Sequence, residues 1–429
     1  MNPHDDKAPR HPARRHFLKA GGAAAIAAGT LGTGAARARE MAATMNRGVE
    51  PFYGRHQGGI ITPQQSHAYV AALDLTTAKR EDIVALLKTW TEMAARLTRG
   101  EPAGTLREPA DKPALDSGEA LDLGASSLTL TFGFGPGMFT QEGKDRYGLA
   151  RYRPPQLVDL PRFNGEQLIA AKTGGDLFIQ GCADNAQVVF HAVRQLIRTA
   201  DGTARVRWGQ AGFLSTPKGE TPRNLMGFKD GTINPAIHDP AAMKQFVWAG
   251  EESPAWMRGG TYTVVRRIRI TLEHWDQMER GFQESVFGRH KYSGAPLGGK
   301  HEMDPLDLKA VDKDGNPIIP ENAHARLSNQ AMNNGAQILR RSYSYNESTD
   351  FYIERWPPWR QETEYDAGLI FIAHQRDPRK GFIPINDRLS KFDMLNQFVT
   401  HVGSAIFACP SGIAPGQYIG QGLFKNLDV

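Results

Sequence analysis

Cysteine is nearly absent from this sequence: Cys182 and Cys409 are the only two in 429 residues. Two thiols cannot make a disulfide framework or a cysteine-based metal cluster, even in an oxidising compartment. We interpret them as separate buried thiols, and a single bridge between them stays the open alternative. Stability must then come from an apolar core, and a chain of this length with 40% apolar residues can bury a sizeable one.

Long apolar runs are also missing. A membrane-spanning helix needs about 20 strongly apolar residues, and the nearest candidate, the Ala/Gly-rich stretch from Ala20 to Ala36, is shorter and only weakly hydrophobic. We therefore predict no stable membrane span. The stretch follows Arg14-Arg15 and runs into Ala36-Arg37-Ala38, so residues 1–38 have the order of a twin-arginine signal peptide. This predicts export of the folded protein to the periplasm, a route commonly taken by proteins that receive a cofactor first.

Basic charge outside this leader is scarce. The whole chain carries a formal +5, and residues 1–38 hold six Lys/Arg and two Asp/Glu, a net +4, so their removal leaves +1. The remaining chain shows no basic stripe of the kind that nucleic-acid-binding proteins present. Nucleic acid is therefore not an expected partner.

The apolar pattern predicts the same order of elements twice. The first half reads as strand 67–75, helix 80–99, strands 128–132 and 176–181, a helix opened by a capping box of Asp184 and Gln187, and strand 206–213. The second half reads as strand 261–271, helix 273–285, strands 338–345 and 368–374, helix 389–399 and a short strand 404–408. The order β-α-β-β-α-β predicts an α+β fold of two ferredoxin-like domains, residues 39–215 and 216–429.

Two features of the second half indicate a functional site. Residues 288–336 are too long for an ordinary connection in a compact domain, and such segments are usually functional or disordered. The sequence Gly227-Phe228-Lys229-Asp230-Gly231-Thr232 places one carboxylate between glycines, where a side chain can be presented from a tight loop. Taken alone, Asp-Gly is ordinary turn chemistry, and a plain turn is the better interpretation of the motif by itself.

The motif indicates a functional loop because the chain resembles the dye-decolorizing peroxidases, whose defining motif is Gly-x-x-Asp-Gly. The chain resembles in particular the periplasmic EfeB-type branch of that family. The resemblance covers nearly the whole chain after the leader. Besides the aspartate loop it is carried by Pro51-Phe52-Tyr53-Gly54-Arg55-His56-Gln57, Thr62-Pro63-Gln64-Gln65, Thr131-Phe132-Gly133-Phe134-Gly135-Pro136-Gly137, Gly294-Ala295-Pro296-Leu297-Gly298, Asn322-Ala323-His324 and Leu339-Arg340-Arg341.

The resemblance implies a haem b cofactor, held mainly by the second domain, with His324 as the axial ligand of the iron. A neutral imidazole leaves the opposite face of the haem open to hydrogen peroxide. There Asp230 is expected to move a proton between the two peroxide oxygens, and Arg340 to stabilise the developing negative charge. Strand alternation favours Arg340 over Arg341 for this role. Further haem-lining positions implied by the family pattern are Gly231, Thr232, Ile233, Lys291 and Asn329. The partner that orients His324 is not identifiable from the sequence.

Three functions are compatible with such a site. The first is a peroxidase that uses hydrogen peroxide to oxidise dyes and other organic reductants. The second is a deferrochelatase, which releases iron from haem with the porphyrin left intact, working with other components of an iron-uptake system. The third is a haem carrier, which gives no reason for Asp230 and Arg340. The family often forms dimers, so a homodimer is possible on the resemblance alone.

Overall fold

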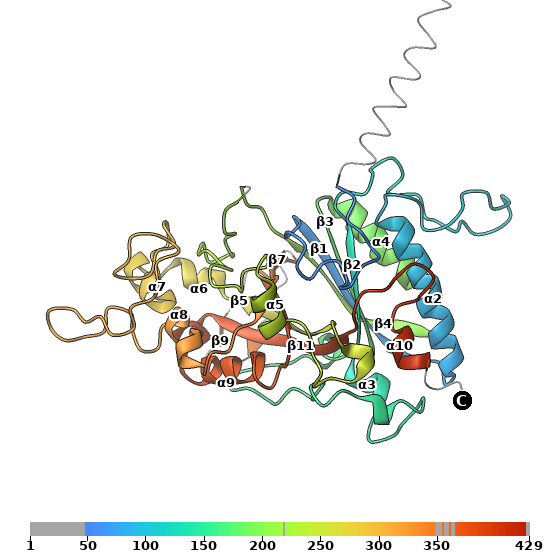
Figure 1. Ribbon diagram of the computed structural model, residues 1–429. Helices are drawn as coiled ribbons and strands as arrows, with labels where there is room; N and C mark the ends of the chain where they lie inside the picture. The colour runs from blue at the N-terminus through green and yellow to red at the C-terminus, as the bar shows by residue number, and fades with distance from the viewer. Residues whose placement is uncertain (1–47, 218, 348–353, 356–359, 362–364, 426–429) are drawn as a thin grey trace, which may run out of the picture. The chain divides into compact units, whose positions relative to one another are not determined.

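Eight of the strands form two antiparallel sets of four, each in the order of a ferredoxin-like sheet (Figure 1). The computed structural model describes residues 48–217, 219–347, 354–355, 360–361 and 365–425. The predicted signal peptide, residues 1–38, lies outside the described residues. The first set has the order β2-β3-β1-β4, and the second has the order β7-β10-β5-β11. The predicted α+β fold of two ferredoxin-like halves is therefore confirmed.

The strands of the two sets are β1 (His67–Leu75), β2 (Thr129–Phe134), β3 (Leu177–Ala183), β4 (Ala204–Phe213), β5 (Thr261–Ile270), β7 (Tyr343–Asn346), β10 (Ala367–Gln375) and β11 (Val399–Cys409). Shorter strands are β6 (Leu339–Arg340), β8 (Glu354–Arg355) and β9 (Arg360–Gln361). The helices are α2 (Arg80–Leu97), α3 (Pro136–Phe139), α4 (Ala186–Arg198), α5 (Pro240–Phe246), α6 (Leu272–Asp276), α7 (Arg280–Phe287), α8 (His324–Leu327), α9 (Phe382–Phe392) and α10 (Gln421–Phe424). Within the described residues, no helix has both the length and the apolar character to cross a bilayer.

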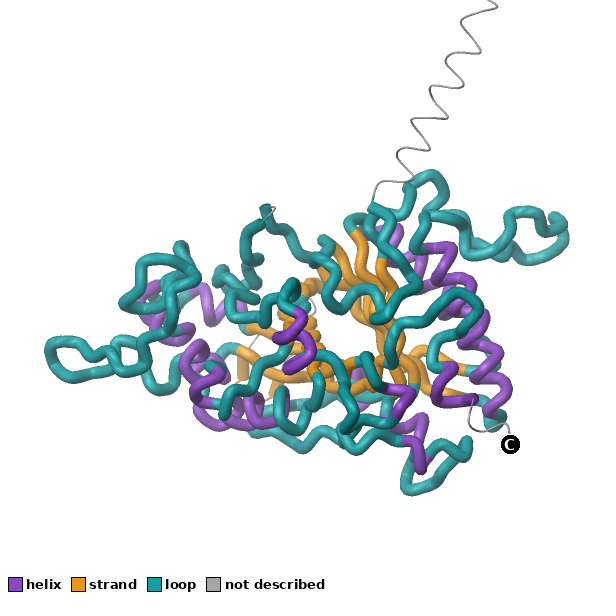
Figure 2. The backbone as a smooth tube through the Cα atoms, in the orientation of Figure 1, coloured by secondary structure: helices purple, strands orange, loops and turns teal. Residues whose placement is uncertain are grey.

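The edges of the two sheets pair with each other. Phe213 of β4 lies opposite Ser344 of β7, and Ala408 of β11 lies opposite Phe134 of β2. With the β5–β10 pairing, these contacts close the eight strands into a ring, whose strands Figure 2 shows between the flanking helices. A closed ring leaves no unpaired sheet edge between the halves.

Alternation along the strands gives the ring an inner core and outer faces. The inner core is built from alternate residues of both sets, among them Val70, Phe178, Tyr343, Ile372 and Phe407. The outer face of the first set packs against α2 and α4, which lie side by side in Figure 1. The outer face of the second set is covered differently, because it forms one wall of a cavity.

Three predicted elements of the second half are wrong in extent. The single helix expected over residues 273–285 is two helices, α6 and α7, and the buried Gln283 side chain donates to the carbonyl of Trp275 at 2.8 Å where α6 ends. The strand expected over residues 338–345 is interrupted between β6 and β7, which both pair with β10. The short final strand is the eleven-residue β11.

Two helix boundaries also differ from the prediction. The helix expected over residues 389–399 is α9, which starts at Phe382 and ends at Phe392. Asp393 stops it, because its carboxylate caps the following turn by accepting the Leu395 N–H at 2.8 Å. Helix α4 is capped by Asn185 and not by the predicted box of Asp184 and Gln187: the Asn185 Oδ1 accepts the backbone N–H groups of Gln187 and Val188.

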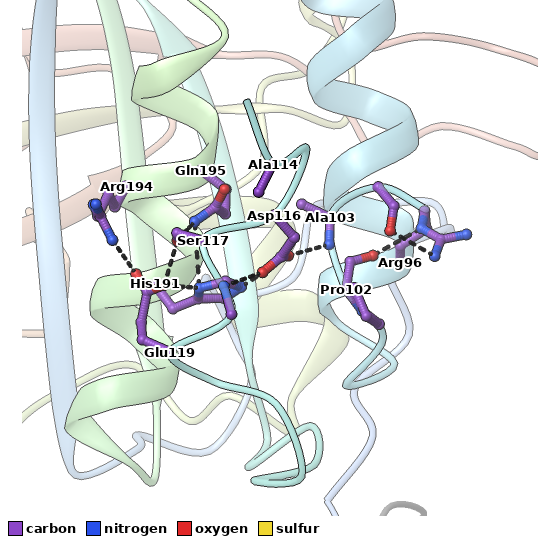
Figure 3. Close-up of polar contacts among 12 residues, drawn as sticks. Arg96, Pro102, Ala103, Ala114, Asp116, Ser117, Glu119, His191, Arg194 and Gln195 are labelled. Atoms are coloured by element: carbon purple, nitrogen blue, oxygen red, sulfur yellow. Dashed lines mark hydrogen bonds and ion pairs between the residues drawn. The ribbon is translucent and has the colours of Figure 1, made fainter. Parts of the chain in front are cut away.

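A buried histidine fastens the long loop of residues 101–127 onto α4 (Figure 3). His191 Nε2 lies 3.3 Å from Asp116 Oδ2, and Nδ1 lies 3.1 Å from Glu119 Oε2. The Asp116 carboxylate is fully buried and also accepts the backbone N–H groups of Ala103 and Gly118, both at 2.7 Å. The Asp116 side chain therefore holds two parts of the loop and links them to His191 of α4.

We predict that Asp116→Ala lowers the free energy of unfolding by about 3 kcal/mol, because it leaves the buried Nε2 of His191 and two backbone N–H groups without their partner. Chemical denaturation measures the change. The control is Glu101→Ala, which removes an exposed pair with Arg99 at 2.8 Å and is expected to cost less than about 1 kcal/mol. Equal losses in both variants would contradict the role given to Asp116.

Both cysteines are free and buried, as the sequence predicts. Cys182 pairs with Thr129 at one end of β2, whereas Cys409 follows Ala408, the partner of Phe134 at the other end. That separation is about 16 Å along the strand, well beyond the reach of a disulfide. Burial raises the pKa of the Cys409 thiol to about 12, although the Thr263 hydroxyl acts in the opposite direction.

We predict that neither thiol reacts with iodoacetamide in the folded protein, because both are buried and the reagent cannot reach them. Unfolding without reductant should expose both, and mass spectrometry should then show two additions. Alkylation that appears only after reduction would show that the two are bridged.

Candidate functional site

A cavity of about 560 Å³ lies against the outer face of β5, β10 and β11. Alternation brings Ile268 and Ile270 of β5 to this face, while Arg267 points the other way, into the ring, where it donates to Gln210. Helices α8 and α9 and residues 163–166 supply other walls. The residues that matter for its chemistry are Asp230, Gly231, Thr232, Ile233, Arg289, His324, Arg340 and Asp393.

Asp230 reaches the cavity from a tight hairpin. Gly227 and Gly231 have φ values of +85° and +116°, which side-chain-bearing residues rarely adopt. The backbone N–H of Asp230 donates to the carbonyl of Pro222 at 2.8 Å. A Cβ at Gly227 would lie 2.8 Å from the Lys291 Cε, so a side chain there would displace the end of that lysine. The glycines therefore allow the turn that presents the carboxylate.

Arg340 lies beside this carboxylate. Its Nη1 donates to Asp230 Oδ1 at 2.8 Å. Asn234 fixes the arginine backbone, because its side chain donates to the Arg340 carbonyl at 2.8 Å and accepts the Arg340 N–H at 3.2 Å. Arg341 faces away from the cavity and donates to the backbone carbonyls of Thr62 and Pro63. Of the two adjacent arginines, Arg340 is the one that meets Asp230.

His324 begins α8 and is oriented by Asp393. The His324 Nδ1 and Asp393 Oδ2 are 2.6 Å apart. A carboxylate accepts here, so the Nδ1 proton lies in this bond and the Nε2 lone pair stays available. Within the described chain Nε2 has no hydrogen-bond partner, and the ring lines the cavity. Burial opposes the charged imidazolium, but attraction by Asp393 outweighs it and raises the pKa of His324.

The structure brings most of the predicted site residues together, with two exceptions. Gly231, Thr232 and Ile233 line the cavity with Asp230, His324 and Arg340. Lys291 and Asn329 do not line it. The Lys291 Nζ donates to Gln283 Oε1 at 2.6 Å, and the Asn329 side chain caps the turn Gln330–Met332 by accepting the Ala331 N–H.

Sequence reasoning missed three residues of the site: Asp393, Arg289 and Asn234. Asp393 lies 69 positions after His324, and an aspartate that follows a helix is usually a cap, so the sequence carries no signal for its second contact. Arg289 lies in the segment that we expected to be functional, two residues before Lys291. Its Nη1 donates to the carbonyls of Gly294 and Glu302, at 2.7 and 2.9 Å.

The residues present fit a haem. The cavity size is typical of a ligand or cofactor site. The described residues contain no group of three or more His, Cys, Asp or Glu side chains placed to share a metal ion. The free Nε2 of His324 suits an iron whose other ligands come from a macrocycle. Phe287, Phe371 and Leu389 supply apolar walls for such a macrocycle, and Arg289 supplies a cation for its carboxylates.

A second, smaller cavity of about 190 Å³ meets the first at the Asp230–Arg340 pair. Asp230, Gly231 and Arg340 line both cavities. The side chains around the smaller one are mostly polar and include Gln64, Thr221, Arg223, Ser342 and Ser344. The carboxylate and the guanidinium thus stand between an apolar cavity and a polar one.

Comparison with known proteins places both halves in one family. Residues 57–214 match the model of the Dyp-type peroxidase N-terminal domain, and residues 221–414 match that of the C-terminal domain. The chain is 38% identical to a dye-decolorizing peroxidase of Thermobifida fusca, over 86% of this chain and 84% of the relative. It is 35% identical to a deferrochelatase of Escherichia coli K12, over 98% and 99% of the two chains.

Solved structures give the same assignment. Ferric DtpA from Streptomyces lividans is 40% identical, with a TM-score of 0.80 over 89% of this chain and 98% of that chain. A DyP-type peroxidase from Streptomyces coelicolor is 41% identical, with the same TM-score and the same coverage.

We predict that Asp393→Ala weakens haem binding about 10- to 100-fold, because the imidazole loses the acceptor that orients it. Titration of the haem-free protein with haem, followed by absorption spectroscopy, measures the affinity. Asp307→Ala is the control, since that exposed carboxylate accepts the N–H groups of Lys309 and Ala310 in its own turn and lies outside the cavity lining. Wild-type affinity in the Asp393 variant would show that the contact between Asp393 and His324 does not support haem binding.

Proposed function

We propose that this chain, a haem-dependent enzyme that belongs to the Dyp-type peroxidase family, uses hydrogen peroxide to oxidise dyes and other organic reductants. We further propose that haem b is the cofactor, that His324 would ligate its iron, and that Asp230 and Arg340 would act on peroxide in the same cavity. The observation that carries the proposal is the 2.8 Å contact between Asp230 and Arg340 in the cavity that His324 also lines. A haem carrier has no use for this pair.

The haem, when bound, supplies the redox chemistry, and the chain's own residues bind, orient and move protons. Asp230 Oδ1 is engaged by Arg340, so in the described chain Oδ2 is the oxygen left to take a proton from peroxide and return it to the departing oxygen. The Arg340 guanidinium holds the Asp230 carboxylate at 2.8 Å and its fixed positive charge stabilises negative charge as the O–O bond breaks. The small polar cavity beside the pair suits the size and polarity of peroxide and water.

We predict that Asp230→Asn slows the reaction of the haem-loaded protein with peroxide about 10²- to 10⁴-fold, because the amide cannot take the proton. Arg340→Leu should slow it about 10²- to 10³-fold, since the fixed positive charge is lost. Stopped-flow absorption at the haem Soret band measures both rates after mixing with peroxide. Haem content should match the wild type in both variants. Wild-type rates in Asp230→Asn with normal haem content would contradict the proposed proton transfer.

A second candidate is the release of iron from haem with the porphyrin left whole. The 35% identity to a deferrochelatase along almost the full chain favours it. The same residues would hold haem in both reactions, so the products decide between them. Metal-free porphyrin, recognised by its fluorescence after turnover, would establish iron release, and oxidised reductant with haem intact would establish the peroxidase.

The leader sequence supports the proposed location. Paired arginines at Arg14-Arg15 followed by an apolar run predict twin-arginine export and a periplasmic protein. A cofactor inserted before export fits that route. Iron release would add components of an iron-uptake system as partners, and a homodimer stays an expectation from the family.

A further inference from the structure

Glu302 contacts the catalytic loop on both sides of Asp230. Its Oε2 accepts from Lys229 Nζ at 2.6 Å, and its Oε1 accepts from the Thr232 hydroxyl at 3.0 Å. Lys229 precedes Asp230 directly, and Thr232 follows it by two positions. Glu302 itself is 72 positions away, in the long segment of residues 288–336.

The loop that carries Asp230 contains two glycines, so contacts from outside the loop can hold its conformation. Gly227 and Gly231 flank Asp230 with left-handed φ values, and glycine gives the backbone more freedom than any other residue. Backbone bonds close the hairpin, among them Asp230 N–H to the Pro222 carbonyl and Asn224 N–H to the Phe228 carbonyl. The contacts of Glu302 add a side-chain hold on the residues at either side of Asp230. The side chains of Lys229 and Glu302 are only 13% and 14% exposed, so their pair is screened less than a surface pair.

The backbone of Glu302 is itself held in place, by Arg289. Arg289 donates to the carbonyls of both Gly294 and Glu302, and so links the two ends of the stretch of residues 294–302. Gly294 makes room for the ion pair, because a Cβ there would lie 2.9 Å from Lys229 Cδ and 3.3 Å from Glu302 Cγ. Burial alone would favour a neutral Glu302, yet bonds from Lys229, Thr221 and Thr232 outweigh it and lower its pKa. The carboxylate is therefore ionised where it meets the loop.

We infer that Glu302 is a positioning residue of the peroxide reaction, which holds Lys229 and Thr232 so that the Asp230 carboxylate stays in register with Arg340. The inference rests on the proposed role of Asp230. On this inference, the segment of residues 288–336 has a functional role. It carries Glu302, which holds the loop around Asp230.

The test is a double-mutant cycle in the haem-loaded full-length protein: Glu302→Ala, Asp230→Asn and the two combined. The readout is the second-order rate constant for peroxide. We expect Glu302→Ala to lower it about 10- to 100-fold, because a shift of about 1 Å in a catalytic group has effects of that size. Haem content and the KM for the reductant should stay at wild-type values. In the Asp230→Asn background, Glu302→Ala should have no further effect.

Two milder variants guard against misfolding. Glu302→Gln keeps the size and one acceptor, so it should lose less rate than Glu302→Ala. Thr232→Val removes one of the two contacts that Glu302 makes beside Asp230, so its loss should also be smaller than that of Glu302→Ala. The matched control is Asp307→Ala, an exposed carboxylate in the same segment whose hydrogen bonds in the described chain come from the backbone N–H groups of Lys309 and Ala310. Its rate should equal that of the wild type.

The outcomes separate the two proposals. If Asp230→Asn is slow while both Glu302 variants react at the wild-type rate, Glu302 does not position the loop and this inference fails alone. It also fails alone if Glu302→Ala slows the Asp230→Asn protein as much as it slows the wild type. If Asp230→Asn reacts at the wild-type rate, the proposed role of Asp230 fails, and a role for Glu302 through it fails as well.

Discussion

The pairing of sheet edges between the two halves is the constraint on which the rest of the structure depends. Each ferredoxin-like sheet alone has two open edges, and here β4 joins β7 while β2 joins β11. Closure fixes which face of every strand points into the ring. The first half packs its outer face against α2 and α4. The second half is then left with an outer face on β5, β10 and β11 that can serve a ligand.

Because side chains alternate between the two faces of a strand, adjacent arginines in these strands have different roles. In β5, Arg266 faces the cavity wall and pairs with Glu166 at 2.6 Å, while Arg267 points into the ring and pairs with Asp366 at 2.9 Å. At β6, Arg340 meets Asp230, and the next residue, Arg341, ties down backbone carbonyls on the other side. One shift in strand register would exchange these tasks. Closure of the ring fixes the strand register, and therefore fixes which side chains face the cavity as well as which face the core.

Local patterns and motif likeness predict the parts of the structure that depend on neighbouring residues. Strand β1 and the extent of α2 follow from apolar periodicity, and the loop around Asp230 follows from its glycines. The start of α9 does not follow from periodicity: Pro384 lies in its first turn, where a proline gives up only an N–H that has no partner there. Asp393 escapes prediction because its second role depends on a contact across 69 positions.

Charge pairing around the cavity shows where a ligand with carboxylates would lie. Among the described cations on its walls, Lys229 pairs with Glu302, Arg266 with Glu166, Arg340 with Asp230 and Lys391 with Asp387. Arg289 contacts two backbone carbonyls and has no carboxylate within ion-pair distance in the described part of the chain. Burial disfavours its positive charge and lowers its pKa, so an incoming carboxylate would relieve that cost. Because Arg289 also holds the backbone of Glu302, and Glu302 contacts the Asp230 loop, a ligand carboxylate at Arg289 would steady the loop that we propose acts on peroxide.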